Sequence, residues 1–229
     1  MNYHNTTYGT FIKRLNRFVA EVNLNGMIEK VHVKNTGRLT QLLEENAEVL
    51  LEMSRDPKRK TKFSLVAVKK DTLWINVDSQ APNTIFHDAL KKGNVKPFGK
   101  MDDIKREATY GESRFDFYFE KGNNKGFIEV KGVTLVENGI ATFPDAPTKR
   151  GTKHVLELMD AMKEGYSAFV VFIVQRQDCH AFTPNAAMDL DFANRLHEAA
   201  NAGVQVLAYK TDIDDKTWGL GRSLPVYFS

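Results

Sequence analysis

The sequence predicts an α/β protein (α+β overall) in which a small N-terminal β-barrel precedes an α/β domain with a partly parallel sheet. Short alternating segments separated by turn signals fill residues 17–77, and strand and helix patterns alternate beyond residue 103. The 229 residues suffice for two hydrophobic cores. With 42% hydrophobic and 27% charged residues, the composition excludes a disordered chain, a collagen-like fibre and a disulfide scaffold.

The predicted barrel begins with a β-hairpin. Apolar residues alternate along 17–24 and again along 27–33, and Asn25-Gly26 between them is a strong signal for a tight turn. A helical turn is expected at 39–43. Further strands are expected at 49–53, 63–68 and 73–77. Five short strands with one helical interruption suit a small barrel, of which the OB-fold is one, and spacing alone does not distinguish it from the others.

A helix and a linker are expected after the barrel. Pro82 suits the first turn of a helix over 82–92, and Gly93 suits its end. Residues 94–103 then form the best linker candidate. We therefore expect a barrel domain of residues 1–81 and a second domain of residues 82–229, in which 82–103 are helix and linker.

The second domain is expected to alternate strands and helices. Residues 114–120 and 125–133 predict a hairpin, and 168–174 is apolar enough for a strand buried on both faces. Thr152 is the expected N-cap of the next helix. The remaining elements are helices at 152–163 and 190–202 and a strand at 204–209. This order predicts a partly parallel sheet.

The only cysteine, Cys179, cannot form an intramolecular disulfide, which favours a reducing compartment. No apolar segment follows a basic start at the N-terminus, and no window is apolar for the roughly 18 residues that a membrane span needs. We expect a cytoplasmic protein with no membrane partner, and the oligomeric state stays open.

The basic residues are concentrated in the predicted barrel. The formal net charge is only +3, but residues 1–80 hold 13 Lys and Arg against 9 Asp and Glu, and the remainder holds 19 against 20. A basic loop at Lys58, Arg59 and Lys60 belongs to this excess. Such side chains bind the phosphates of nucleic acids without reading sequence.

One cluster in the second domain predicts chemistry. Asp116 lies on the first strand of the predicted hairpin, and alternation places Glu129 and Lys131 on one face of the second strand. If the strands pair antiparallel, two carboxylates and a lysine form a site for Mg²⁺ or Mn²⁺. The spacing Asp-x₁₂-Glu-x-Lys is the pattern of the PD-(D/E)xK nucleases without its first proline. The alternative is a surface hairpin in which Glu129 and Lys131 are solvated neighbours.

Four further residues are candidates. Glu107, on an expected helical segment upstream, would complete the metal site or would be a solvated helix position. Arg150 and His154 lie one turn apart at the start of a helix, where they would face the same anion or form an exposed basic turn. Gln175 ends the buried strand at the edge where α/β sites lie, or is only a strand terminus.

Several longer strings resemble the sugar fermentation stimulation protein family, SfsA. They are VKNTGRL (33–39), KTKFSL (60–65), NVDSQAPN (76–83), YGESRFD (110–116), EVKGVTL (129–135) and FPDAPTKRGTKH (143–154). The resemblance covers about residues 17–209. It implies an N-terminal OB-like domain, a C-terminal PD-(D/E)xK nuclease-like domain, and a regulatory link to sugar utilisation, especially of maltose.

The resemblance also implies roles for individual residues. Asp116, Glu129 and Lys131 would be the nuclease-like triad, Glu107 an accessory acid, and Arg38 and Arg114 nucleic-acid contacts. The predicted function is sequence-nonspecific DNA binding, with the strand state of the DNA left open. The alternative is a Mg²⁺-dependent nuclease that uses the triad.

Overall fold

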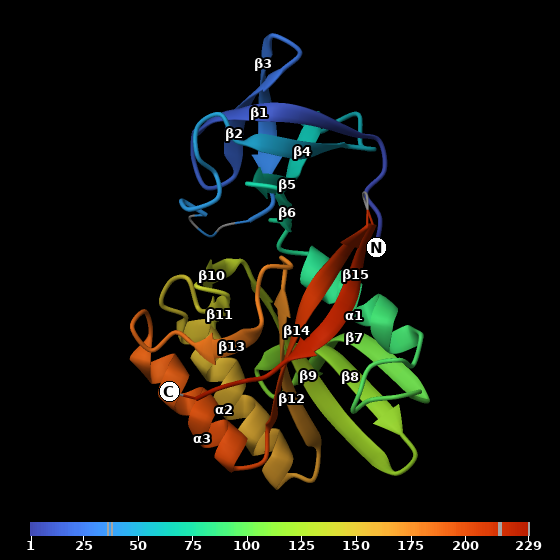
Figure 1. The fold of residues 1–229 in the computed structure, drawn as a ribbon. Coiled ribbons are helices and arrows are strands. Elements are labelled where there is room, and N and C mark those ends of the chain that lie inside the picture. The colour runs from blue at the N-terminus through green and yellow to red at the C-terminus, as the bar shows by residue number, and fades with distance from the viewer. Residues whose placement is uncertain (36, 38, 215–216, 229) are drawn as a thin grey trace.

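The computed structural model describes residues 1–35, 37, 39–214 and 217–228, the side chain of Asp214 excepted. Figure 1 shows a β-barrel formed by the N-terminal third of the chain above a larger α/β domain. Helix α1 follows the barrel directly and lies beside the sheet of the second domain.

The barrel is closed by its third and fifth strands. Its six-stranded sheet has the order β3-β2-β1-β4-β5-β6, and β3 also pairs parallel with β5 through His32↔Ser64 and Val33↔Leu65. The five closed strands surround one apolar core, as expected of an OB-fold. The strands are β1 (Thr6–Arg14), β2 (Val19–Leu24), β3 (Met27–Val33), β4 (Glu48–Met53), β5 (Phe63–Lys70) and β6 (Leu73–Asn76).

The structure confirms the predicted hairpin and adds one strand. Asn25 and Gly26 have φ of 53° and 86°, the positive values that a tight hairpin turn of this sequence requires at both positions. Strand β1 was not expected, because Phe11 is its only fully buried residue and its remaining positions lack a regular apolar alternation. The segment expected as a helical turn contains hydrogen-bonded turns at Leu39–Leu43.

The second domain has a six-stranded sheet of order β15-β14-β12-β9-β8-β7, in which β12 lies parallel to both β9 and β14. A three-stranded sheet of β10, β11 and β13 lies beside it. The strands are β7 (Asp103–Tyr110), β8 (Ser113–Lys121), β9 (Asn124–Val133), β10 (Leu135–Glu137), β11 (Ile140–Phe143), β12 (Ser167–Val174), β13 (Ala181–Pro184), β14 (Gln205–Asp214) and β15 (Thr217–Leu224).

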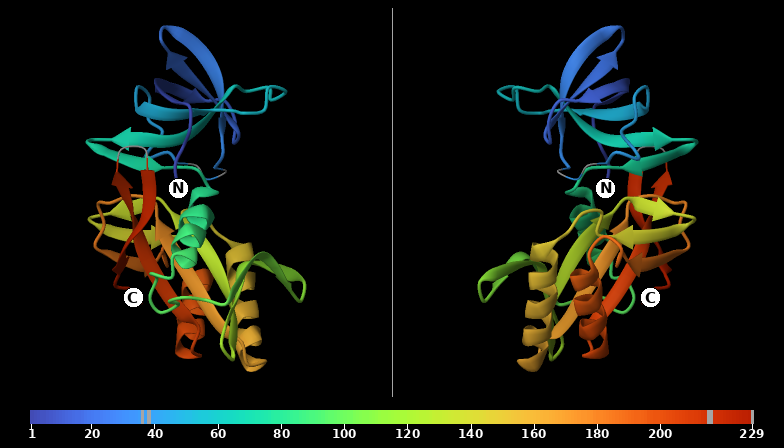
Figure 2. Two further views of the ribbon diagram at one scale, coloured as in Figure 1. Left: turned by 90° about the vertical axis from the view of Figure 1, so that its right-hand side faces the viewer. Right: turned by 90° about the vertical axis from the view of Figure 1, so that its left-hand side faces the viewer.

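Helices cover both faces of the large sheet. Helices α2 (Lys149–Lys163) and α3 (Leu190–Asn201) pack against one core, and α1 (Ala81–Lys91) packs against the core on the opposite face. The two side views in Figure 2 show this arrangement, with the barrel above the end of the sheet. None of the helices in the described ranges is long and apolar enough to cross a membrane.

Two expectations about local structure were wrong. The segment containing Glu107 is strand β7 and not a helix, because it pairs along its length with β8. Helix α2 begins at Lys149, one turn earlier than expected, because Thr148 and not Thr152 is its N-cap and accepts a hydrogen bond from Gly151 N. Helix α3 begins at Leu190, where Asp189 caps it by accepting from Phe192 N.

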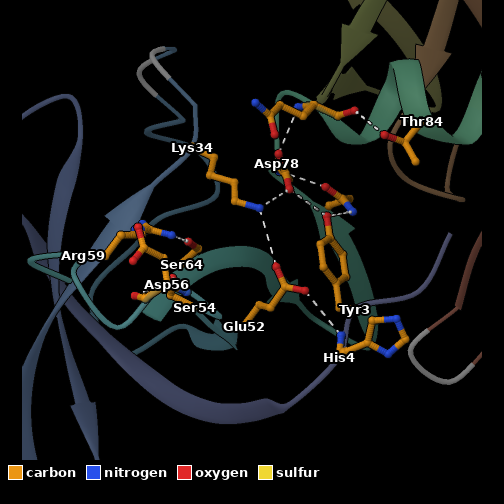
Figure 3. A network of polar contacts seen from close by, with 12 residues as sticks. Tyr3, His4, Lys34, Glu52, Ser54, Asp56, Arg59, Ser64, Asp78 and Thr84 are labelled. Carbon is orange, nitrogen blue, oxygen red and sulfur yellow. Dashed lines mark hydrogen bonds and ion pairs between the residues drawn. The ribbon is translucent and has the colours of Figure 1, made fainter. Parts of the chain in front are cut away.

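A polar network joins the barrel to helix α1 (Figure 3). Asp78 follows β6 and is buried, and its Oδ2 accepts hydrogen bonds from Tyr3 OH (3.2 Å) and Lys34 Nζ (2.9 Å). Its Oδ1 accepts from the backbone N–H of Gln80 at 2.9 Å, immediately before α1. Lys34 also forms an ion pair with Glu52 on β4 (3.6 Å). The start of α1 is thereby fixed relative to the barrel.

Replacement of Asp78 tests this anchor. Asp78→Ala leaves the Lys34 ammonium without its nearest partner and the Tyr3 hydroxyl without an acceptor, so we expect the free energy of unfolding to fall by about 2–3 kcal/mol. Urea denaturation monitored by tryptophan fluorescence measures this. Asp160→Ala, which removes an exposed pair with Lys163, is the matched control and should change little. Equal effects of the two variants would contradict an anchoring role for Asp78.

Candidate active site

The site forms where β8 separates from β9. The two strands pair from Lys121↔Asn124 to Phe117↔Ile128. Beyond that pair, Asp116 Oδ2 accepts the backbone N–H of Val130 at 2.8 Å, in place of a ladder hydrogen bond. Phe115 and Phe117 accordingly pack into the cores on opposite faces of the sheet. Asp116 therefore lies at a kink that directs its carboxylate toward β9.

Asp116 is held from the other side by helix α1. Asn83 Nδ2 donates to Asp116 Oδ1 at 2.7 Å. Burial and then the negative charge of Glu129 raise the pKa of Asp116 to about 6, although hydrogen bonds from Val130 and Asn83 and the charge of Lys131 oppose this. Asp116 is thus an acid whose ionisation is opposed by its surroundings and would be favoured by a bound cation.

Glu129 and Lys131 lie on one face of β9, as alternation predicted, toward α2. Ile128 and Val130 face the core under α1. Lys131 Nζ lies 2.6 Å and His154 Nδ1 lies 2.5 Å from Glu129 Oε1. Burial disfavours ionisation of Glu129, but the hydrogen bond with His154 and the charge of Lys131 outweigh it and hold the pKa of Glu129 below its usual value. A buried, ionised carboxylate therefore lies beside Asp116.

The second oxygen of this carboxylate is available for a ligand. Glu129 Oε2 is buried and has no hydrogen-bond partner among the residues that the structure describes. Among the described residues, no three His, Cys, Asp or Glu side chains are arranged to hold a metal ion by themselves. Mg²⁺ and Mn²⁺ nevertheless accept one or two carboxylates completed by water and substrate phosphate. Asp116 and Glu129 fit such a cation.

Glu107 lies near this pair but is engaged elsewhere. It falls between the pairs Arg106↔Phe117 and Ala108↔Phe115, which places it opposite Asp116 on β7. Its backbone has a φ of 54°, and its carboxylate forms a 2.9 Å ion pair with Arg114. In this arrangement Glu107 partners an arginine, and its role as an accessory metal ligand stays a prediction.

Several predicted phosphate contacts lie together beside the carboxylates. A groove is lined by Thr109, Glu112, Ser113, Arg114, Arg150, Lys153 and His154. Arg114 and Arg150 are exposed, as a phosphate contact requires. His154 is only 4% exposed and contacts Glu129, so it does not offer the open anion contact that its sequence position suggested.

The basic loop of the barrel lies between β4 and β5. Lys58 and Lys60 are exposed, whereas Arg59 is half-buried and donates hydrogen bonds to Ser64 (3.1 Å) and Thr61 (3.3 Å). Two lysines of the loop are thus available to a phosphate. Arg38, the other predicted contact on the barrel, lies outside the described residues.

Two contributors were missed or misassigned from the sequence. Asn83 lies one residue after Pro82 in the string NVDSQAPN, but no spacing rule connects it with Asp116. His154 was interpreted as an anion contact because its neighbours are basic.

Gln175 does lie at the end of β12, where its backbone N–H donates to Val133 O (2.8 Å) and its carbonyl accepts from Asn76 N (3.1 Å). It therefore connects the sheet to the barrel.

The raised pKa of Asp116 predicts a specific dependence of stability on pH. The folded protein binds more protons than the unfolded chain between about pH 4 and 6, so the Asp116 contribution makes stability fall as pH rises through this window. Asp116→Asn removes this contribution, because its side chain is neutral at every pH in the window. We expect the variant to exceed the wild type by about 2 kcal/mol at pH 7.5 and to equal it near pH 4.

Urea denaturation at both pH values measures the difference. Asp160→Asn on the exposed face of α2 is the control, and its difference from the wild type should not vary in this way. An Asp116→Asn curve parallel to that of the wild type from pH 4 to pH 7.5 would show that Asp116 ionises normally.

Comparisons with known proteins match both domains. The family descriptions "SfsA N-terminal OB domain" and "Sugar fermentation stimulation protein RE domain" match residues 12–77 and 80–217. A "Sugar fermentation stimulation protein homolog" of Alkaliphilus oremlandii is 50% identical over 99% of this chain and 98% of its own length. Another from Desulfitobacterium hafniense is 47% identical with the same coverage.

A solved structure agrees with these relatives. The structure titled "The structure of Pyrococcus Furiosus SfsA in complex with Ca2+" is 28% identical, with a TM-score of 0.92 over 99% of this chain and 98% of that one. The sequence resemblance and the predicted fold class are confirmed. The chain belongs to the sugar fermentation stimulation protein family, SfsA.

Proposed function

We propose that this protein binds DNA without sequence specificity and hydrolyses its phosphodiester bonds with a divalent cation at Asp116, Glu129 and Lys131. The observation that carries the proposal is the meeting of two carboxylates and a lysine with one buried carboxylate oxygen, Glu129 Oε2, left without a partner. The Pyrococcus relative was solved in complex with Ca²⁺, a hard cation that also prefers carboxylate oxygens.

Each residue of the site has a chemical part. Asp116 and Glu129 would hold Mg²⁺ or Mn²⁺. When bound, such a cation supplies neutralisation of charge on the phosphate and lowers the pKa of its water. Lys131, whose ammonium lies against Glu129, offers positive charge to the attacked phosphate and a donor to the nucleophilic water. Asn83 and the Val130 N–H keep Asp116 oriented.

Phosphate contacts would come from both domains. Arg114, Arg150 and Lys153 line the groove beside the carboxylates. Lys58 and Lys60 are exposed on the barrel loop. Contacts from these side chains to phosphate oxygens would carry no sequence information, which fits the proposed binding without sequence specificity.

A second candidate function is DNA binding without hydrolysis. The observation in its favour is that both oxygens of Asp116 and one of Glu129 already accept hydrogen bonds from the protein itself. A site that has lost its catalytic activity would keep these hydrogen bonds only because they stabilise the fold. The link to sugar and maltose utilisation stays a prediction from the family resemblance.

Cleavage assays distinguish the two functions. With Mg²⁺ or Mn²⁺ and either plasmid or single-stranded DNA, we expect the wild type to cleave and Glu129→Gln to fall to background. Lys131→Met should lower the rate by about 100-fold or more, because it removes the positive charge beside the phosphate. Gel quantification of products measures both.

The matched control is Glu120→Gln, an acid on β8 that pairs with Tyr118 and Lys125 away from the site. It should retain wild-type activity. Wild-type cleavage no greater than that of Glu129→Gln, in either cation and on either substrate, would leave binding alone as the function.

The salt dependence of affinity tests the phosphate contacts of the barrel. The logarithm of the DNA association constant should fall linearly with the logarithm of salt concentration, and the double variant Lys58→Ala/Lys60→Ala should reduce the slope by about 1–2. Fluorescence anisotropy with labelled DNA measures the slope. Lys163→Ala at the far end of α2 should leave it unchanged. A double variant with the wild-type slope would remove this loop from the DNA interface.

A further inference from the structure

We propose that Arg150 and His154 form a hydrogen-bonded relay that orients Glu129, so that Oε1 is occupied by protein donors and Oε2 alone is presented to the cation. His154 is in this view a positioning residue, and Arg150 connects it to the phosphate groove. The inference rests on the proposed function for the cation, but its tests separate the two.

The donors and acceptors of the relay set the tautomer of His154. Arg150 Nε lies 3.4 Å from His154 Nε2, and a guanidinium can only donate, so Nε2 must accept. Nδ1, which lies 2.5 Å from Glu129 Oε1, is then the ring nitrogen that donates to the carboxylate. An ionised carboxylate can only accept, so the direction of donation is Arg150 to His154 to Glu129.

The surroundings of His154 hold the ring in this orientation. His154 is 4% exposed, and its ring meets Phe115 edge to face, with centroids 6.0 Å apart at 75°. Arg150 lies one helical turn earlier on α2, so the helix sets their spacing. The start of α2 is itself fixed by the Thr148 cap.

The relay explains the asymmetry of the Glu129 carboxylate. Lys131 and His154 both donate to Oε1, and within the described part of the chain no donor reaches Oε2, although Glu129 is buried. If the His154 donor is lost, one of the two contacts that hold Oε1 disappears and the carboxylate can rotate. A residue that orients a metal ligand in this way typically changes metal affinity 10–100-fold when it is replaced.

The exposed part of Arg150 couples the relay to the groove. Its Nε lies 3.4 Å from His154 Nε2, and Arg150 as a whole is exposed and lines the same groove as Arg114 and Lys153. A phosphate bound there and the carboxylate that holds the cation are therefore joined through two side chains. Substrate binding and the orientation of Glu129 are expected to depend on each other.

Ca²⁺ binding by isothermal titration calorimetry tests the relay without requiring catalysis. Asparagine can place its amide N–H where His Nδ1–H lies, whereas glutamine places its amide nearer the position of Nε2. We expect His154→Ala and His154→Gln to weaken Ca²⁺ binding by about 10–100-fold, and His154→Asn to remain within about threefold of the wild type. His197→Ala, an exposed histidine of α3, is the control and should bind as the wild type does.

Nitrogen NMR of ¹⁵N-histidine protein at pH 8 provides a second readout that needs neither cation nor DNA. We expect His154 to be protonated on Nδ1 and unprotonated on Nε2, and Arg150→Ala to change this tautomer balance. A thermal melt of each variant checks folding, and the NMR result on the wild type stands even where a variant does not fold.

The outcomes separate the two claims. Normal Ca²⁺ affinity in folded His154→Ala, or rescue by glutamine and not by asparagine, would overturn the relay while leaving the cation site intact. An Nε2-protonated His154 would also overturn it. A wild type that binds no Ca²⁺, Mg²⁺ or Mn²⁺ would overturn the proposed function, and with it the presentation of Oε2 to a cation, even if the predicted tautomer is found.

Discussion

The carboxylate of Glu129 is a negative charge in the core of the α/β domain, and its neutralisation constrains the elements around it. Removing an ion from water costs several kcal/mol unless opposite charge and hydrogen bonds compensate. Lys131 on the same strand and His154 on α2 supply this compensation. The rotation of α2 against β9 is therefore constrained, because a shift of one residue along the helix would turn the side chain at this position away from Glu129.

The surroundings of Asp116, the neighbouring carboxylate, shift its pKa in the opposite direction to that of Glu129. Burial and the charge of Glu129 raise the pKa of Asp116 to about 6, whereas the hydrogen bond with His154 and the charge of Lys131 lower the pKa of Glu129. Two neighbouring carboxylates whose pKa values are shifted in opposite directions are typical of functional sites. Asn83 connects Asp116 to α1, and Asp78 connects the start of α1 to the barrel, so both domains contribute to the placement of the pair.

The sequence was sufficient for features that depend on local patterns. Alternation placed Glu129 and Lys131 on one face, and Asn25-Gly26 predicted a hairpin turn that the structure confirms. Strand β1 was not predicted, because a strand with only one fully buried residue shows little alternation of apolar and polar residues. The segment around Glu107 was expected to be a helix. It is a strand because it pairs with β8 across a turn, and this pairing cannot be recognised from the residues of the segment alone. The contacts of Asn83 and His154 join segments 33 and 25 residues apart, and only the folded chain brings them together.

The central claim is that Asp116 and Glu129 together bind a divalent cation through the free oxygen of Glu129. A crystal structure from crystals soaked in Mn²⁺, with anomalous diffraction recorded at the manganese edge, tests it most directly. We expect an anomalous peak between Asp116 and Glu129 Oε2, with His154 still in contact with Oε1, and we expect the peak to be absent in Glu129→Gln. A map without a peak at this position, or with manganese bound only elsewhere on the protein, would contradict it.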